Sequence, residues 1–223
     1  MRHQYTETTI ILIFIITCTA AASAQGLYPA FPSPGPYTLG QGYFAPKEPG
    51  KTFHEARQNF LDEEYKIAAE DIRKGAVFIK VEAARGTKES HKLLGEAAQD
   101  LEKLAVKVEN GTADSARELD EAFASAHHAL ARHYILTAGE AWAKKETTLT
   151  GQYLQAAAYH FMYAMAWDSR KLETASLAAI KKSRTVARKL IEGSDYAAED
   201  VSKALETMSG QIATKNKQPA GGP

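Results

Sequence analysis

The sequence predicts an all-α protein, an antiparallel bundle of five to seven helices, on three observations. Residues 51–218 contain no proline, so nothing in this stretch interrupts long helices. Alanine, lysine and glutamate are abundant, and valine and isoleucine are few outside the N-terminal segment, which favours helix over sheet. In residues 113–145, apolar side chains recur at three- and four-residue steps on two sides of one helix.

The two apolar stripes of residues 113–145 predict the centre of the bundle. The first stripe comprises Leu119, Phe123, Ala126, Leu130, Thr137 and Ala141. The second lies about 140° further round the helix and comprises Ala124, His128, Ala131, Ile135, Ala138 and Trp142. A surface helix needs only one stripe, so we expect this helix to be covered on both sides.

The N-terminal residues 1–24 have the pattern of a secretory signal peptide. Arg2 precedes an apolar run at 10–16, and Ala-Ser-Ala at 22–24 supplies the small residues of a cleavage site. The run is too short to span a bilayer as a mature anchor, although an uncleaved anchor is the alternative. We therefore expect export, with a bacterial periplasm as the destination.

Cys18 is the only cysteine and lies inside this segment. A lipid-modified cysteine is an alternative fate, but Thr17 stands where a small glycine or alanine is usual. Cleavage after Ala24 would leave a mature chain without cysteine, held together by its core and not by disulfides.

The mature chain divides by composition into three parts. Residues 25–51 hold six of the eight prolines together with several aromatic residues, which predicts a disordered leader. This leader is a spacer, or its aromatic side chains dock on a partner or on the bundle. Residues 52–213 are the predicted helical domain, and 214–223 a disordered tail.

Glycines and capping residues divide the helical domain. We expect a hairpin of helices at 53–61 and 65–84 around a turn at 62–64, a third helix ending at Gly111, and a turn at 146–151. Residues 152–192 form one helical pattern with a possible break at 168–169. Thr87, Thr112 and Ser194 are predicted to cap the helices that follow them.

The expected buried positions follow the helical period. They are Ala68, Ile72, Ala76, Ile79 and Ala83 in the second helix, and Leu94, Ala97, Leu101, Leu104 and Val108 in the third. The first half of residues 152–192 is apolar nearly all round, and its second half has one stripe of Leu172, Ala175, Ala179, Val186 and Leu190. Val201, Ala204, Leu205, Met208 and Ile212 mark the last helix.

The chain aligns with itself without a gap at a displacement of 82 residues. Gly111 then falls on Gly193 and Phe60 on Trp142, with several alanines in register. Because glycines that end helices fix the phase of the pattern, we interpret this as a tandem duplication. Coincidence in an alanine-rich composition is the alternative.

Two stretches resemble the YfdX family of small exported bacterial helical proteins. They are residues 56–69 (Ala-Arg-Gln-Asn-Phe-Leu-Asp-Glu-Glu-Tyr-Lys-Ile-Ala-Ala) and 187–198 (Ala-Arg-Lys-Leu-Ile-Glu-Gly-Ser-Asp-Tyr-Ala-Ala). The resemblance is one of pattern and length, and it implies a periplasmic, non-enzymatic protein connected with stress. It brings no site residues.

Histidines are the residues with candidate chemistry. His128 and His160 lie on the two helices expected to be most buried, and facing one another they would bind a transition metal or non-covalent haem. No two histidines have the i, i+4 spacing of a one-helix chelate, and no Glu-x-x-His motif is present. We therefore favour buried histidines bonded to a tyrosine hydroxyl or a backbone carbonyl, with no cofactor.

Charge and motifs exclude other function classes. The 27 basic and 27 acidic side chains balance, which argues against nucleic acid as a partner. The basic stretch at 181–189 is flanked by Glu173 and Glu192, which indicates a solvated face, with phosphate or anionic lipid as the alternative. No motif of an enzyme is found. The sequence thus predicts a non-enzymatic binding protein, stress-related or chaperone-like, whose partner is another protein or a second copy. A metal- or haem-binding bundle and a structural envelope component are the alternatives.

Overall fold

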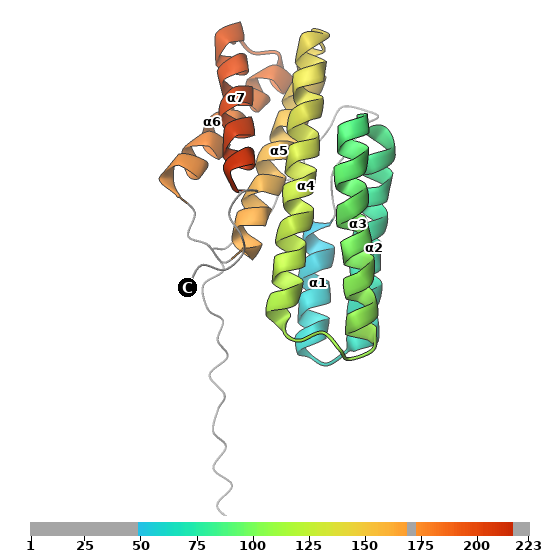
Figure 1. Cartoon of the computed structure of the whole chain (residues 1–223). Helices are drawn as coiled ribbons and strands as arrows, with labels where there is room; N and C mark the ends of the chain where they lie inside the picture. Colours follow the sequence, from blue (N-terminus) through green and yellow to red (C-terminus); the bar gives the residue numbers. More distant parts are fainter. Residues whose placement is uncertain (1–48, 169–172, 216–223) are drawn as a thin grey trace, which may run out of the picture. The chain divides into compact units, whose positions relative to one another are not determined.

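A computed structural model describes residues 49–168 and 173–215, which form seven helices and no strand (Figure 1). The helices are α1 (Gly50–Leu61), α2 (Tyr65–Arg85), α3 (Lys88–Glu109), α4 (Ala116–Ala143), α5 (Thr147–Trp167), α6 (Thr174–Glu192) and α7 (Ala198–Lys215). The predicted all-α bundle is confirmed. The predicted signal peptide and most of the predicted leader lie outside the described residues. Within the described residues, no helix has the length and apolar character needed to cross a membrane.

Helix α4 lies at the centre of the bundle. It packs against α1 and α3 on one side and against α5 and α7 on the other (Figure 1). Leu119, Phe123 and Leu130 of the first stripe and Ile135 and Ala138 of the second are buried. The prediction of a helix covered on both sides is therefore confirmed, with Thr137 and Trp142 only half-buried.

The first helical hairpin has the predicted turn, but α1 begins at Gly50, three residues before the predicted start and inside the predicted leader, and α2 ends one residue later than predicted. The turn between α1 and α2 occupies residues 62–64, and its middle residue, Glu63, has a positive φ of 62°. All five predicted positions of α2 and all five of α3 are buried. Thr87 caps α3 as expected, because its Oγ1 accepts a hydrogen bond from the backbone N–H of Ser90 at 3.2 Å.

The turn predicted at 146–151 is wrong. The chain turns at residues 144–146, where Lys145 has a φ of 63° and the N–H of Glu146 donates to the carbonyl of Ala141 at 2.9 Å. Helix α5 begins directly afterwards, so Gly151 lies inside it. This glycine allows close packing and does not end a helix: a Cβ there would lie 2.7 Å from the carbonyl oxygen of Ala187 on α6.

Thr112 and Ser194 do not cap the helices that follow them. The N–H groups of both residues donate back to the preceding helix, to the carbonyls of Lys107 and Lys189 at 2.8 and 2.9 Å. Each follows a glycine of positive φ, and that conformation turns the next N–H toward the helix just completed. Helices α4 and α7 begin only four residues after these positions.

The long pattern at 152–192 is broken where the sequence suggested. Helix α5 ends at Trp167, with Asp168 as its C-cap, and α6 starts at Thr174. The predicted stripe of α6 is buried at Ala179, Val186 and Leu190, whereas Ala175 is exposed and Leu172 lies outside the described residues. In α7, Leu205 is half-buried and the other four predicted positions are buried.

Helix boundaries recur at the 82-residue displacement seen in the sequence. Moved by 82 residues, α2 coincides with α5 at both ends, the start of α4 coincides with the start of α7, and the end of α1 with the end of α4. The residues of positive φ follow the same spacing, because Glu63 matches Lys145 and Gly111 matches Gly193. Residues 50–131 (the first half) and 132–213 (the second half) thus have the same sequence of helices. Helix α4 belongs to both halves, because it runs across the boundary between residues 131 and 132.

We predict that Gly151→Ala lowers the free energy of unfolding by about 1–3 kcal/mol, because the new methyl group would meet backbone and side-chain atoms of α6. Gly95→Ala in α3 is the matched control. Nothing lies within 4 Å of the added atom there, so we expect a gain of about 0.5–1 kcal/mol from helix propensity. Urea denaturation measures the free energy of unfolding of both variants. If the two substitutions change it equally, the α5–α6 contact is looser than described.

Candidate functional site

The centre of the α4–α5 contact is a pair of buried imidazoles. The Nδ1 atoms of His127 on α4 and His160 on α5 are 3.0 Å apart, and both side chains are fully buried. The sequence paired His160 with His128. The structure places His127 against His160, while the ring of His128 packs against Phe161 with centroids 5.9 Å apart.

The position of His127 on α4 explains why the apolar pattern of the sequence does not identify it. On a helical projection, His127 and Tyr134 lie between the two apolar stripes, at the middle of the surface that α5 covers. The stripes follow mainly apolar residues, so the pattern assigns no role to the polar residues between them. The sequence does contain a sign of this site: His127 and Tyr134 are seven residues apart, and both lie on the surface between the two stripes.

Aromatic rings enclose the imidazole pair. His160 stacks on Tyr134, with centroids 5.3 Å apart and an interplanar angle of 8°. His127 lies 5.1 Å from the ring of Tyr163 and meets Phe53 edge-on at 5.5 Å. These contacts leave each ring little rotational freedom, so the two Nδ1 atoms are held facing one another.

The row of rings continues to a third histidine on α1. His54 contacts Trp167 at 4.6 Å and Tyr163 at 6.3 Å between centroids. Its pKa is lowered by burial first and then by the Arg57 guanidinium, which itself binds Asp120 on α4 at 2.7 Å. The row therefore links α1, α4 and α5 through ring contacts, most of them tilted or edge-on.

Only one proton can occupy the space between the two Nδ1 atoms. One ring must donate an N–H and the other must accept it, so the contact requires at least one neutral imidazole. The Nε2 atoms of both rings have no hydrogen-bond partner among the described residues. Burial lowers the pKa of His127 well below its usual value and that of His160 to about 3, with neighbouring histidines adding to the effect. Both rings are accordingly neutral at pH 7.

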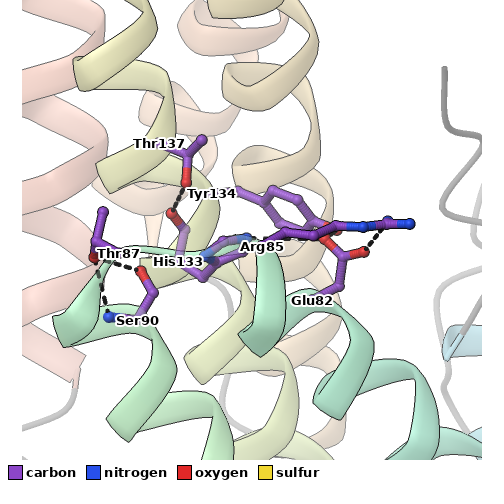
Figure 2. Close-up of polar contacts among 7 residues, drawn as sticks. All are labelled: Glu82, Arg85, Thr87, Ser90, His133, Tyr134 and Thr137. Atoms are coloured by element: carbon purple, nitrogen blue, oxygen red, sulfur yellow. Dashed lines mark hydrogen bonds and ion pairs between the residues drawn. The ribbon is translucent and has the colours of Figure 1, made fainter.

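A buried carboxylate fixes the tyrosine that covers His160. The Tyr134 hydroxyl donates to Oε2 of Glu82 on α2 at 2.8 Å, and Arg85 donates to Oε1 at 3.0 Å (Figure 2). Burial raises the pKa of Tyr134, and the Glu82 charge raises it further. Tyr134 is thus a neutral donor whose ring orientation depends on Glu82.

His133 lies at the edge of this carboxylate cluster. Its Nε2 is 3.8 Å from Oε2 of Glu82 (Figure 2), and burial lowers its pKa to about 4. Gly86, which follows α2, makes room for the ring, because a Cβ there would lie 3.2 Å from Nδ1 of His133 and 2.7 Å from the Ser90 Cβ. Glycine at this position therefore ends α2 and also admits the imidazole.

The geometry of the imidazole pair fits a hydrogen bond better than a metal site. Two nitrogens on one tetrahedral zinc ion would lie about 3.4 Å apart, and the observed 3.0 Å is an ordinary hydrogen-bond length. Histidines that bind metals usually donate their second N–H to a partner, which neither Nε2 has among the described residues. No group of three or more His, Cys, Asp or Glu side chains within the described ranges is arranged to hold a metal ion. A metal at His128 and His160 stays a prediction.

We predict that Tyr134→Phe lowers the free energy of unfolding by about 1–3 kcal/mol, because Glu82 would lose a buried donor. Tyr134→Phe combined with Glu82→Leu should recover part of this loss, since no buried charge then lacks a partner. Tyr196→Phe, at an exposed tyrosine, is the control and should change little. If urea denaturation shows that Tyr134→Phe leaves the free energy of unfolding unchanged, Glu82 does not anchor Tyr134 as described.

Comparisons of the chain with protein-family models, with curated proteins and with solved structures find no match. The resemblance to the YfdX family therefore stays a prediction based on two stretches of sequence.

Proposed function

We propose that this chain is an exported, non-enzymatic protein of the periplasm or cell envelope that binds other proteins under stress, in the manner of a chaperone. The observation that carries the proposal is the His127–His160 pair at the centre of the core. A buried polar contact that requires a neutral imidazole makes the packing of α4 on α5 sensitive to acid.

Acid acts on this pair in a defined direction. When both imidazoles are protonated, both Nδ1 atoms become donors, the hydrogen bond is lost, and two like charges face one another inside the core. Besides burial, the pKa of His127 is lowered by the charge of His160 first and then by those of His54 and His128, and the pKa of His160 is lowered by that of His133. Protonation of these neighbours adds positive charge and deepens the destabilisation.

Loosening the α4–α5 contact would expose the surfaces that a binding protein needs. Phe53, Phe123 and Trp167 pack around the histidines, with Phe53 and Phe123 stacked at 4.3 Å between centroids. Apolar surface of this kind binds the exposed apolar segments of unfolded proteins. An exported chain meets the pH of its surroundings, so acid stress would reach the histidines directly.

We predict that the free energy of unfolding falls as the pH is lowered from about 6.5 toward 3. The folded-state pKa values of the buried histidines lie below the unfolded value, so the unfolded chain binds more protons in this window. Each such histidine contributes a slope of about 1.4 kcal/mol per pH unit. Urea denaturation at pH 7, 5 and 4 measures the slope.

Aggregation assays with a heat-unfolded client protein at pH 7 and pH 4 test whether protection appears in acid.

Two variants separate the pair from the other histidines. His127→Leu with His160→Leu should make the pH dependence shallower, leaving the contribution of His133, and abolish protection of the client at pH 4. His91→Gln, at an exposed histidine of α3, should leave both unchanged. A wild-type chain whose stability is constant down to pH 4, or equal protection at both pH values, would overturn the proposal.

A metal- or haem-binding bundle is the second candidate, because the core brings two imidazoles from different helices together; a metal between them would require the Nδ1 atoms to move apart from the observed 3.0 Å. The same purified sample tests it by metal analysis and an absorption spectrum. A stoichiometric metal or a Soret band that is lost in His160→Leu would favour this candidate over the first.

A further inference from the structure

We propose that α2 carries a docking surface for a second copy of this chain, and that copies join head to tail. The inference rests on the 82-residue correspondence between the two halves and is independent of the proposed function. Two surfaces would form the contact. One is an apolar stripe on α2 in the first half, and the other is the face of α4 and α7 in the second half that receives this stripe (the receiving face).

Inside one chain, the second half binds the first through a stripe on α5. Tyr163 and Trp167 of this stripe contact His54 on α1, and Trp167 also packs on Phe123 of α4 at 5.2 Å between centroids. Tyr159 lies beside the start of α1, because a Cβ at Gly50 would be 3.1 Å from its hydroxyl. The α5 stripe is therefore an interface between the halves, received by α1 and the N-terminal part of α4.

The equivalent stripe on α2 is exposed. Val77, Phe78 and Val81 stand 82 residues before Tyr159, His160 and Tyr163. Val77 is 54% exposed and Val81 44%, with Phe78 half-buried beside them. Ile67 on the same helix is also exposed. At the matching positions of α5, His160 and Tyr163 are buried and Tyr159 is half-buried, so the α2 side chains are more exposed than their α5 counterparts.

The receiving face also has an equivalent. Leu136 on α4 and Leu205 on α7 stand 82 residues after His54 and Phe123, and both are half-buried. Ser209 corresponds to His127 and is exposed. Helices α4 and α7 pack together, as α1 and α4 do in the first half. The second half thus presents the counterpart of the face that α5 occupies in the first half.

These correspondences select a second copy of the chain as the occupant. The α2 stripe has the position of the α5 stripe, and the face that receives such a stripe is repeated on α4 and α7 of the same sequence. Joining the α2 stripe of one copy to the α4–α7 face of another repeats the internal contact between copies.

The test is the oligomeric state of the full chain as a function of concentration, by sedimentation velocity. The wild-type chain should form a concentration-dependent series of oligomers that does not stop at a dimer, as a head-to-tail contact requires. Val77→Glu with Val81→Glu blocks the α2 stripe, and Ser209→Arg blocks the receiving face. Each variant alone should be monomeric, with association weakened by about tenfold or more.

Mixing the two variants distinguishes head-to-tail joining from other modes. Each variant retains the surface that the other has lost, so the mixture should form a one-to-one dimer that grows no further. Val106→Glu on α3, where the native valine is 51% exposed, is the matched control and should associate like wild type. A wild-type chain that is monomeric at all concentrations would overturn the proposal. So would a mixture that stays monomeric. A Ser209→Arg variant that dimerises by itself would also overturn it, because that is the result expected if α2 pairs with α2.

Discussion

The contact between α4 and α5 is the constraint on which the rest of the structure depends. Helix α4 can lie at the centre only because α5 covers the surface between its two stripes, and the middle of that surface is His127 against His160. The rings around the pair connect it to α1 through His54 and to α2 through Tyr134 and Glu82. One line of polar and aromatic side chains therefore holds α1, α2, α4 and α5 in position relative to one another.

Such an arrangement is costly in a core that is otherwise rich in alanine and leucine. An unpaired buried nitrogen costs about 1–3 kcal/mol, and both His127 and His160 have one among the described residues. Apolar side chains of similar size would pack without this cost. The pair supplies instead a core whose stability depends on protonation, which is the property that the proposed stress-related role uses.

Hydrophobic periodicity and the positions of glycine and proline predict most of the fold, because buried faces repeat every three to four residues and the glycines of positive φ end helices at fixed places. The errors came from residues with two possible uses. Gly151 was interpreted as a turn but permits the close approach of α6, and Thr112 and Ser194 complete the preceding helices. At the site, the apolar pattern identified His128, whereas the contact belongs to His127, whose neighbour on α5 depends on helix packing that spacing does not encode.

The protonation states of His127 and His160 test the central claim most directly. Nitrogen-15 NMR of the folded, labelled chain reports which ring nitrogen of each histidine carries a proton, with His127→Leu and His160→Leu providing the assignments. We expect both rings to be neutral at pH 7, with Nδ1 protonated in one and Nε2 in the other, and to remain neutral well below pH 6 while the chain is folded. Both rings titrating near pH 6.5 in the folded chain would contradict the account.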